Sequence, residues 1–129
     1  MNPPTLLLAV AADPQQAARA RADGADLIDV RAATPGALAA IQASLPGTLL
    51  WTGPADAEPF DADVWPARTG SGPAPAGSLP AVIAAAAVGT WLGVPVIRSR
   101  HIRAVRRAID MTLVIAGTRP PARTIRGLA

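Results

Sequence analysis

Short apolar runs alternate with helix-like segments along the first 30 residues. Residues 5–11, TLLLAVA, are an unbroken apolar run of strand length, and residues 26–30, DLIDV, are a second. Between them, Asp13 and Pro14 carry the pattern of a helix N-terminus, and Gly24 stands where a left-handed residue would end that helix. The spacing is close to the shortest crossover that joins parallel strands. The pattern therefore predicts a strand–helix–strand unit.

The same alternation continues further along the chain, with one interruption. Residues 34–47 predict a second helix and residues 48–52 a third strand, whereas residues 53–77 are rich in Pro, Gly and acids and predict an irregular loop. Within that loop, ADVW at 62–65 is a candidate short fourth strand. Ser78 is expected to cap a helix that is apolar nearly all round, which we expect to lie between the sheet and another element. Alternating strands and helices predict an α/β fold with a parallel sheet of four or five strands.

Residues 95–111, PVIRSRHIRAVRRAIDM, join a short apolar strand to an amphipathic helix. Ser99 is the candidate N-cap of this helix, whose apolar positions recur at helical spacing from residue 102 to residue 113. Arg106 and Asp110 are four positions apart on its polar face and are expected to pair.

The start of that helix is a candidate anion site. In a parallel sheet, the carboxyl end of a strand and the N-terminus of the next helix are where phosphate groups bind. Arg98, Arg100 and His101 stand at this junction. The alternative is a solvated basic face with one hydrogen-bonded histidine.

Composition limits the chemistry. The chain has 129 residues, enough for a single domain but about half of the roughly 250 that a complete (β/α)₈ barrel needs. It has no cysteine and one histidine, so neither a disulfide framework nor a zinc site is expected, and we predict no metal.

Residues 117–129 predict an extended basic tail. We expect no nucleic-acid partner because no aromatic residues alternate with the arginines.

Residues 69–97 carry no charged residue, which is also a property of membrane spans. Prolines and glycines interrupt the stretch and alanine supplies most of its bulk, so a helix packed within the protein is the favoured interpretation. The N-terminus lacks the basic region of a signal peptide. A cytoplasmic location without membrane contact is therefore expected.

Two segments resemble a known family. Residues 24–30, GADLIDV, and residues 78–111, an alanine-rich helix followed by VIRSRHIRAVRRAIDM, are similar to dihydropteroate synthase, the pterin-binding barrel of folate biosynthesis. The ending GTRPPARTIRGLA resembles tails of actinobacterial paralogues of that enzyme. The resemblance covers residues 5–38 and 77–129, and it implies a partial (β/α)₈ TIM barrel.

The resemblance also implies a reduced site. Arg98 matches the family's arginine on the last strand, Arg100 stands at the position of its anion-binding histidine, and His101 lies one place beyond. Asp29 and Thr34 are weaker candidates for the substrate loops. The family's pterin-binding aspartates, asparagine and lysine have no counterpart, and this chain has no lysine at all. We therefore expect no catalytic residues and no cofactor, with Mg²⁺ relevant only if the family's chemistry were retained.

Three functions follow as alternatives. The first is a non-catalytic relative that binds a partner chain and a pterin or pyrophosphate-type anion. Its partner would be a second copy or a full-length relative, because a sheet cut from a barrel has two open edges. The second is a small transferase that completes its site by oligomerisation. The third is an unrelated flavodoxin-like domain whose basic tail docks an acidic partner.

Overall fold

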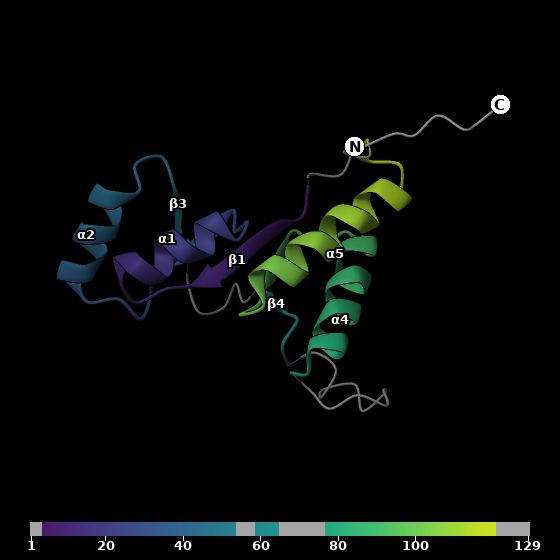
Figure 1. Ribbon diagram of the computed structural model, residues 1–129, viewed down its shortest axis with the longest axis horizontal. Helices are drawn as coiled ribbons and strands as arrows, with labels where there is room; N and C mark the ends of the chain where they lie inside the picture. The colour runs from purple at the N-terminus through teal and green to yellow at the C-terminus, as the bar shows by residue number, and fades with distance from the viewer. Residues whose placement is uncertain (1–3, 54–58, 65–76, 121–129) are drawn as a thin grey trace.

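The computed structural model describes residues 4–53, 59–64 and 77–120, which form five strands and four helices. In chain order these are β1 Leu6–Val10, α1 Pro14–Ala22, β2 Leu27–Asp29, α2 Pro35–Ser44, β3 Leu49–Trp51, β4 Phe60–Asp61, α4 Leu79–Trp91, β5 Val96–Arg98 and α5 Ile102–Ile115 (Figure 1). In the described part of the chain, no helix is long and apolar enough to cross a membrane.

All five strands run parallel in one sheet, in the order β3-β2-β1-β5-β4. Consecutive strands are neighbours on both sides of β1, and β5 returns to pair with β1. In a (β/α)₈ barrel each strand lies beside the next and the last beside the first. The observed order is therefore that of an arc of such a barrel with the strands between β3 and β4 left out. It differs from the 2-1-3-4-5 order of flavodoxin-like folds.

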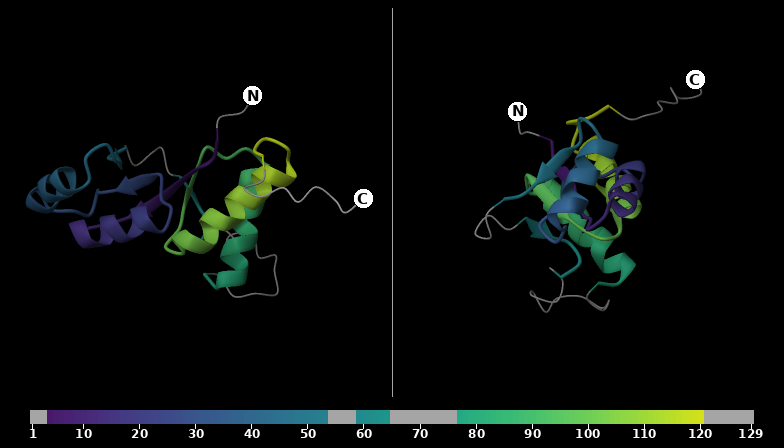
Figure 2. Two further views of the ribbon diagram at one scale, coloured as in Figure 1. Left: turned by 45° about the horizontal axis from the view of Figure 1, so that its top comes forward. Right: turned by 90° about the vertical axis from the view of Figure 1, so that its left-hand side faces the viewer.

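The four helices cover one face of the sheet (Figure 2). Leu7, Ala9, Ile28 and Ile97 point from the central strands into one core, where they meet the buried sides of α1, α2, α4 and α5. The core is built mainly from Ala, Val, Leu and Ile, as a chain with few aromatic residues requires. The opposite, helix-free face is mixed, with buried Leu8 and exposed Leu49.

The helix boundaries in the first half follow the predicted signals. Asp13 caps α1 by accepting a hydrogen bond from the backbone N–H of Gln16 at 2.8 Å. Thr34 caps α2 by accepting from the backbone N–H of Ala37 at 3.2 Å. Gly24 and Gly47 adopt the left-handed conformation, with φ of 109° and 80°, just beyond the two helices.

Two predictions for the middle of the chain were wrong. The fourth strand is Phe60–Asp61, while residues 62–64 form a turn, because pairing with β5 fixes the strand's position. The α4 helix is not enclosed. It packs on the sheet and on α5 through one side, whereas Trp91 and several neighbours on its outer side are exposed.

The predicted caps of the last two helices also need correction. Ser78 occupies the N-cap position of α4 but makes no capping hydrogen bond. The N-cap of α5 is His101 and not Ser99, because the helix begins at Ile102; the Ser99 hydroxyl accepts from the His101 backbone N–H and donates to Asp63. The pairing of Arg106 with Asp110 is confirmed, at 2.8 Å. The loop at 65–76 and the tail from residue 121 lie outside the described residues.

Candidate functional site

Two cavities lie at the carboxyl ends of the strands, the edge where open parallel sheets bind ligands. The first has a volume of about 360 Å³ and lies between α1 and the turn that follows β5. The second, of about 330 Å³, lies above β1 and β2. Both are near the lower limit for small-molecule sites, about 300 Å³, so a ligand would have to be small.

Arg98 separates the two cavities and lines both. It is the last residue of β5 and lies on the helix-free face, beside Leu8 of β1 and Asp61 of β4 in the strand register. The residue is half-buried. Within residues 4–53, 59–64 and 77–120, its guanidinium makes no hydrogen bond or ion pair. A partly desolvated cation of this kind is suited to bind an anion.

Arg100 lines the first cavity together with Arg98, but an internal carboxylate engages it. Asp63, in the turn after β4, lies 3.7 Å from the Arg100 side chain and accepts a hydrogen bond from the Arg100 backbone N–H at 3.0 Å. Asp63 also accepts from the Ser99 hydroxyl at 2.7 Å. The negative charge at this turn is thus supplied by the protein itself.

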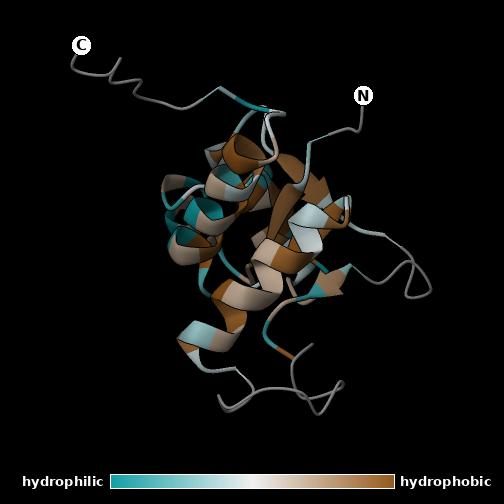
Figure 3. Ribbon diagram, turned by 90° about the vertical axis from the view of Figure 1, so that its right-hand side faces the viewer, coloured by the Kyte–Doolittle hydropathy of each residue, from teal (hydrophilic) through white to brown (hydrophobic). Residues whose placement is uncertain are grey.

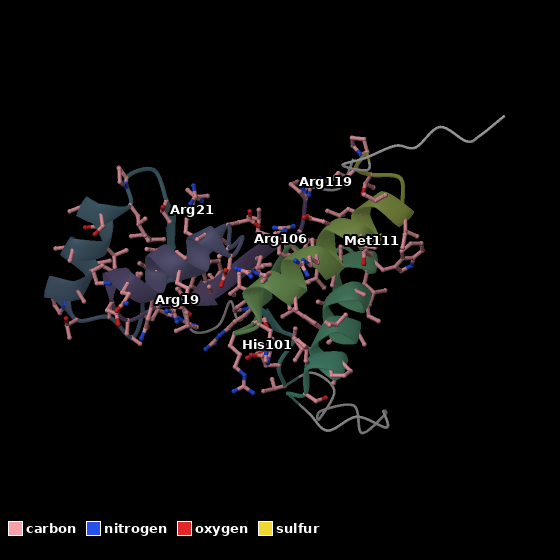
Figure 4. The ribbon with its side chains drawn as sticks, viewed as in Figure 1. Arg19, Arg21, His101, Arg106, Met111 and Arg119 are labelled. Atoms are coloured by element: carbon pink, nitrogen blue, oxygen red, sulfur yellow. The ribbon has the colours of Figure 1, made fainter. Side chains whose placement is uncertain are left out.

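His101 stands apart from both cavities. It occupies the N-cap position of α5, and its backbone N–H donates to the Ser99 hydroxyl at 3.0 Å. Its Nε2 atom is buried and has no hydrogen-bond partner among the described residues. Figure 4 shows His101 at the N-terminal end of α5. Its predicted contact with an anion stays a prediction.

Asp29 lines the second cavity, whereas Thr34 lines neither and serves to cap α2. Asp29 is almost fully buried, with 2% of its surface exposed, and lies 2.8 Å from the Arg31 guanidinium. Burial alone would raise the pKa of its carboxyl group. Hydrogen bonds from Arg31 and the positive charges of Arg31 and Arg98 outweigh burial, and the pKa is lowered below its usual 3.8.

Arg19 is a cavity residue that the sequence analysis missed. Together with Gln16 and Ala20 of α1 and the C-cap residue Asp23, it lies on one side of the helix at spacings of three and four residues, and all four line the first cavity. Figure 4 shows Arg19 and Arg21 on opposite sides of this helix. The spacing was visible in the sequence, but only the position of α5 shows that this side of α1 borders a cavity.

The opposite charges in the first cavity are partly compensated. Asp63 pairs with Arg100, and Asp23 pairs with Arg103 of α5 at 2.9 Å. Arg19, like Arg98, makes no ion pair within the described ranges. The cavity therefore combines two unpaired arginines with the carboxylate of Asp61. No cluster of three or more His, Cys, Asp or Glu side chains suited to a metal ion occurs in the part of the chain that the structure describes.

These features define an α/β protein with a small, arginine-lined site at the carboxyl end of a partial barrel. A stretch of 51 residues, 40% of the chain, is 45% identical to the inactive dihydropteroate synthase 2 of Mycobacterium leprae. It is 41% identical to the proteins of the same name from Mycobacterium bovis and Mycobacterium tuberculosis. The matches span only 18% and 16% of those relatives' lengths. No family model and no solved structure matches the chain.

Proposed function

We propose that the chain is a non-catalytic, dihydropteroate synthase-like protein that binds a small phosphorylated anion of the pyrophosphate type at Arg98. The observation that carries this proposal is the Arg98 guanidinium, which lies at the junction of the two cavities and makes no ion pair within 4 Å with any residue that the structure describes. Its partial burial weakens competition from water, which strengthens a charge-assisted hydrogen bond. The similarity to inactive dihydropteroate synthase 2 proteins supports the non-catalytic part of the proposal.

The surrounding residues favour a simple anion over a whole pterin substrate. The site offers guanidinium groups from Arg98 and Arg19 and hydrogen-bonding capacity from Gln16. A cavity of about 360 Å³ is small for a pterin joined to a pyrophosphate. The pyrophosphate end alone fits this set of donors.

Calorimetry with inorganic pyrophosphate tests the proposal. We expect binding by the wild-type chain and a loss of about 10- to 100-fold in affinity for Arg98→Ala, the range given by a charged hydrogen bond of about 1.5–3 kcal/mol. Arg19→Ala should weaken binding less, because α1 borders only the first cavity.

Arg21→Ala is the matched control, because Arg21 is exposed on α1 and lines neither cavity. Equal affinities of Arg98→Ala and the wild type would reject the site. The absence of any heat for the wild type, at protein concentrations high enough to detect millimolar binding, would reject anion binding altogether.

We also propose that the chain associates with another chain. The outer side of α4 supports this, because it exposes large apolar side chains and its sequence, LPAVIAAAAVGTW, contains no charged residue. The open sheet edges support it less, since β3 and β4 have only three and two residues, and short edge strands resist pairing with other chains.

A further inference from the structure

The wall of the first cavity carries as many negative charges as positive ones. Six charged residues line it, three arginines and three aspartates: Arg19, Arg98, Arg100, Asp23, Asp61 and Asp63. A site for a purely anionic ligand is expected to be lined mainly by cations, because every carboxylate beside a bound anion repels it. The mixed wall therefore favours a ligand that carries charges of both signs.

Two ion pairs within the protein balance half of these charges. Asp63 lies 3.7 Å from the Arg100 side chain, and Asp23 lies 2.9 Å from Arg103. Arg103 comes from α5, whose charged positions are dark teal in Figure 3. The charges of Asp23, Asp63 and Arg100 are thus already compensated before any ligand enters the cavity.

Arg19, Arg98 and Asp61 are the lining residues whose charges remain. Within residues 4–53, 59–64 and 77–120, none of the three makes an ion pair. The Asp61 carboxylate accepts a hydrogen bond from the backbone N–H of Asp63 at 2.9 Å, which orients the carboxylate without neutralising it. Two cations and one anion are therefore left for a ligand.

Arg98 and Asp61 are neighbours on adjacent strands, yet they do not pair with each other. The strand register places Asp61 of β4 beside Arg98 of β5. Adjacent strands lie about 4.8 Å apart, so opposite charges at such positions are close enough to attract each other. Both residues are half-buried at the cavity, and each keeps its charged group available. A ligand with two different charged groups can engage both at once.

We propose that the first cavity binds a phosphate monoester that also carries a primary ammonium group on a short alkyl linker. The phosphate accepts hydrogen bonds from Arg98 and Arg19, and the ammonium group donates to the Asp61 carboxylate. This inference rests on the anion site proposed above and names the class of ligand that the site takes. A phosphate monoester carries about −1.5 to −2 charges at pH 7, so its charges and that of the ammonium group match two arginines and one aspartate.

Two simpler classes of ligand satisfy fewer of these groups. A simple amino acid has one carboxylate with a single negative charge, which leaves one of the two arginines without a counter-charge. An anion without an amine leaves the Asp61 carboxylate beside the bound phosphate, where like charges repel. The cavity volume of about 360 Å³ also suits a small ligand with a short linker.

Calorimetry on the wild-type chain with two matched probes is the first test. Phosphoethanolamine carries both charged groups, and ethyl phosphate is the same molecule without the amine. We expect phosphoethanolamine to bind at least about 10-fold more tightly, the effect of one further charged hydrogen bond. The net charge of the chain is +3, so unspecific attraction alone would favour ethyl phosphate, the more negative probe. Equal affinities would overturn the inference, and no variant has to fold for this test.

Asp61→Asn tests whether Asp61 receives the ammonium group. Asparagine keeps a side-chain oxygen that accepts from the Asp63 backbone N–H, so the turn after β4 should be preserved. We expect the variant to lose about 10-fold in affinity for phosphoethanolamine and to bind ethyl phosphate at least as tightly as the wild type does. Asp110→Asn is the matched control, because Asp110 lies on α5 and lines neither cavity, and this variant should keep the preference.

The remaining outcomes separate this inference from the proposal on which it rests. A wild-type chain that gives no heat with either probe or with pyrophosphate overturns both. A chain that binds pyrophosphate without preferring phosphoethanolamine to ethyl phosphate overturns the ligand class and keeps the anion site. A preference that persists in Asp61→Asn overturns the role of Asp61, and glycine binding as tight as that of phosphoethanolamine overturns the need for a phosphate. Arg98→Ala should weaken both probes alike, because they share the anion site.

Discussion

α2 and α4 lie at the two ends of the same helix layer, but the side chains exposed on their outer sides differ in polarity. Within the described residues neither has a further helix on its outer side, because the sheet ends with β3 and β4 there. The outer side of α2 exposes small or polar residues, including Gly36, Ala40 and Gln42. The outer side of α4 exposes Ile83, Val88 and Trp91.

The difference shows that a position at the end of the helix layer does not by itself create an apolar surface. Both helices are rich in alanine and lie at an end of the layer, so neither composition nor position accounts for the difference between their outer sides. α2 is adapted to solvent at its free side. α4 retains large side chains that only a covering partner would remove from water.

The buried sides of the two helices give the largest expected effect. α2 buries a single residue, Ile41, which is fully inaccessible, whereas α4 buries six. We therefore expect Ile41→Ala to reduce the free energy of unfolding by about 2–5 kcal/mol, measured by urea denaturation. Ala40→Ser, one position away and exposed, should change it by less than about 0.5 kcal/mol. A loss below 1 kcal/mol for Ile41→Ala would mean that α2 is anchored by other contacts.

A buried and an exposed ion pair, Asp29–Arg31 near α2 and Asp23–Arg103 between α1 and α5, give the next comparison. Asp29, near α2, is buried beside Arg31, whereas Asp23 pairs with Arg103 at the surface, where the side chains are 28% and 71% exposed. At pH 7, Asp29→Asn should lower stability by about 1–3 kcal/mol, because a buried charged hydrogen bond is lost. Asp23→Asn should lower it by no more than about 0.5 kcal/mol, because solvent screens the pair.

The Asp29 effect should also depend on pH. The pKa of Asp29 is lower in the folded chain than its usual 3.8, so the folded state favours the ionised carboxylate. Its contribution is complete above about pH 4 and disappears as the pH falls through the folded-state pKa. The stability difference between wild type and Asp29→Asn should therefore shrink in acid. A difference that stays constant from pH 7 to about pH 2 would show that Asn loses packing and not charge.

Local signals in the sequence predicted most of the fold. Asp13 and Thr34 cap the first two helices as expected, and the apolar runs at residues 5–11 and 26–30 contain β1 and β2. Errors arose where distant contacts decide the outcome. β4 lies at Phe60–Asp61 because it pairs with β5, and the Ser99 hydroxyl, three positions before the start of α5, donates to Asp63 from 36 positions away.

In the candidate site, too, local sequence predicted some features, whereas contacts between distant residues determined the others. The position of Arg98 at the end of its strand followed from the local apolar pattern. That Asp63 would engage Arg100, and that Arg19 would border the same cavity, depends on how β4 and α1 meet the turn after β5. The exposure of α4 was likewise hidden, because an apolar helix sequence does not indicate whether anything covers it.

The smallest effect we predict comes from the N-caps of the two end helices. The Thr34 hydroxyl oxygen accepts a hydrogen bond from the backbone N–H of Ala37, whereas Ser78 occupies the same position on α4 without a capping bond. Thr34→Ala should therefore cost about 1 kcal/mol in the free energy of unfolding. Ser78→Ala should cost close to nothing, because its buried hydroxyl has no partner within the described residues. If urea denaturation gave equal losses in the free energy of unfolding for Thr34→Ala and Ser78→Ala, Ser78 would cap α4 in solution. The two helices would then be capped alike at their N-termini.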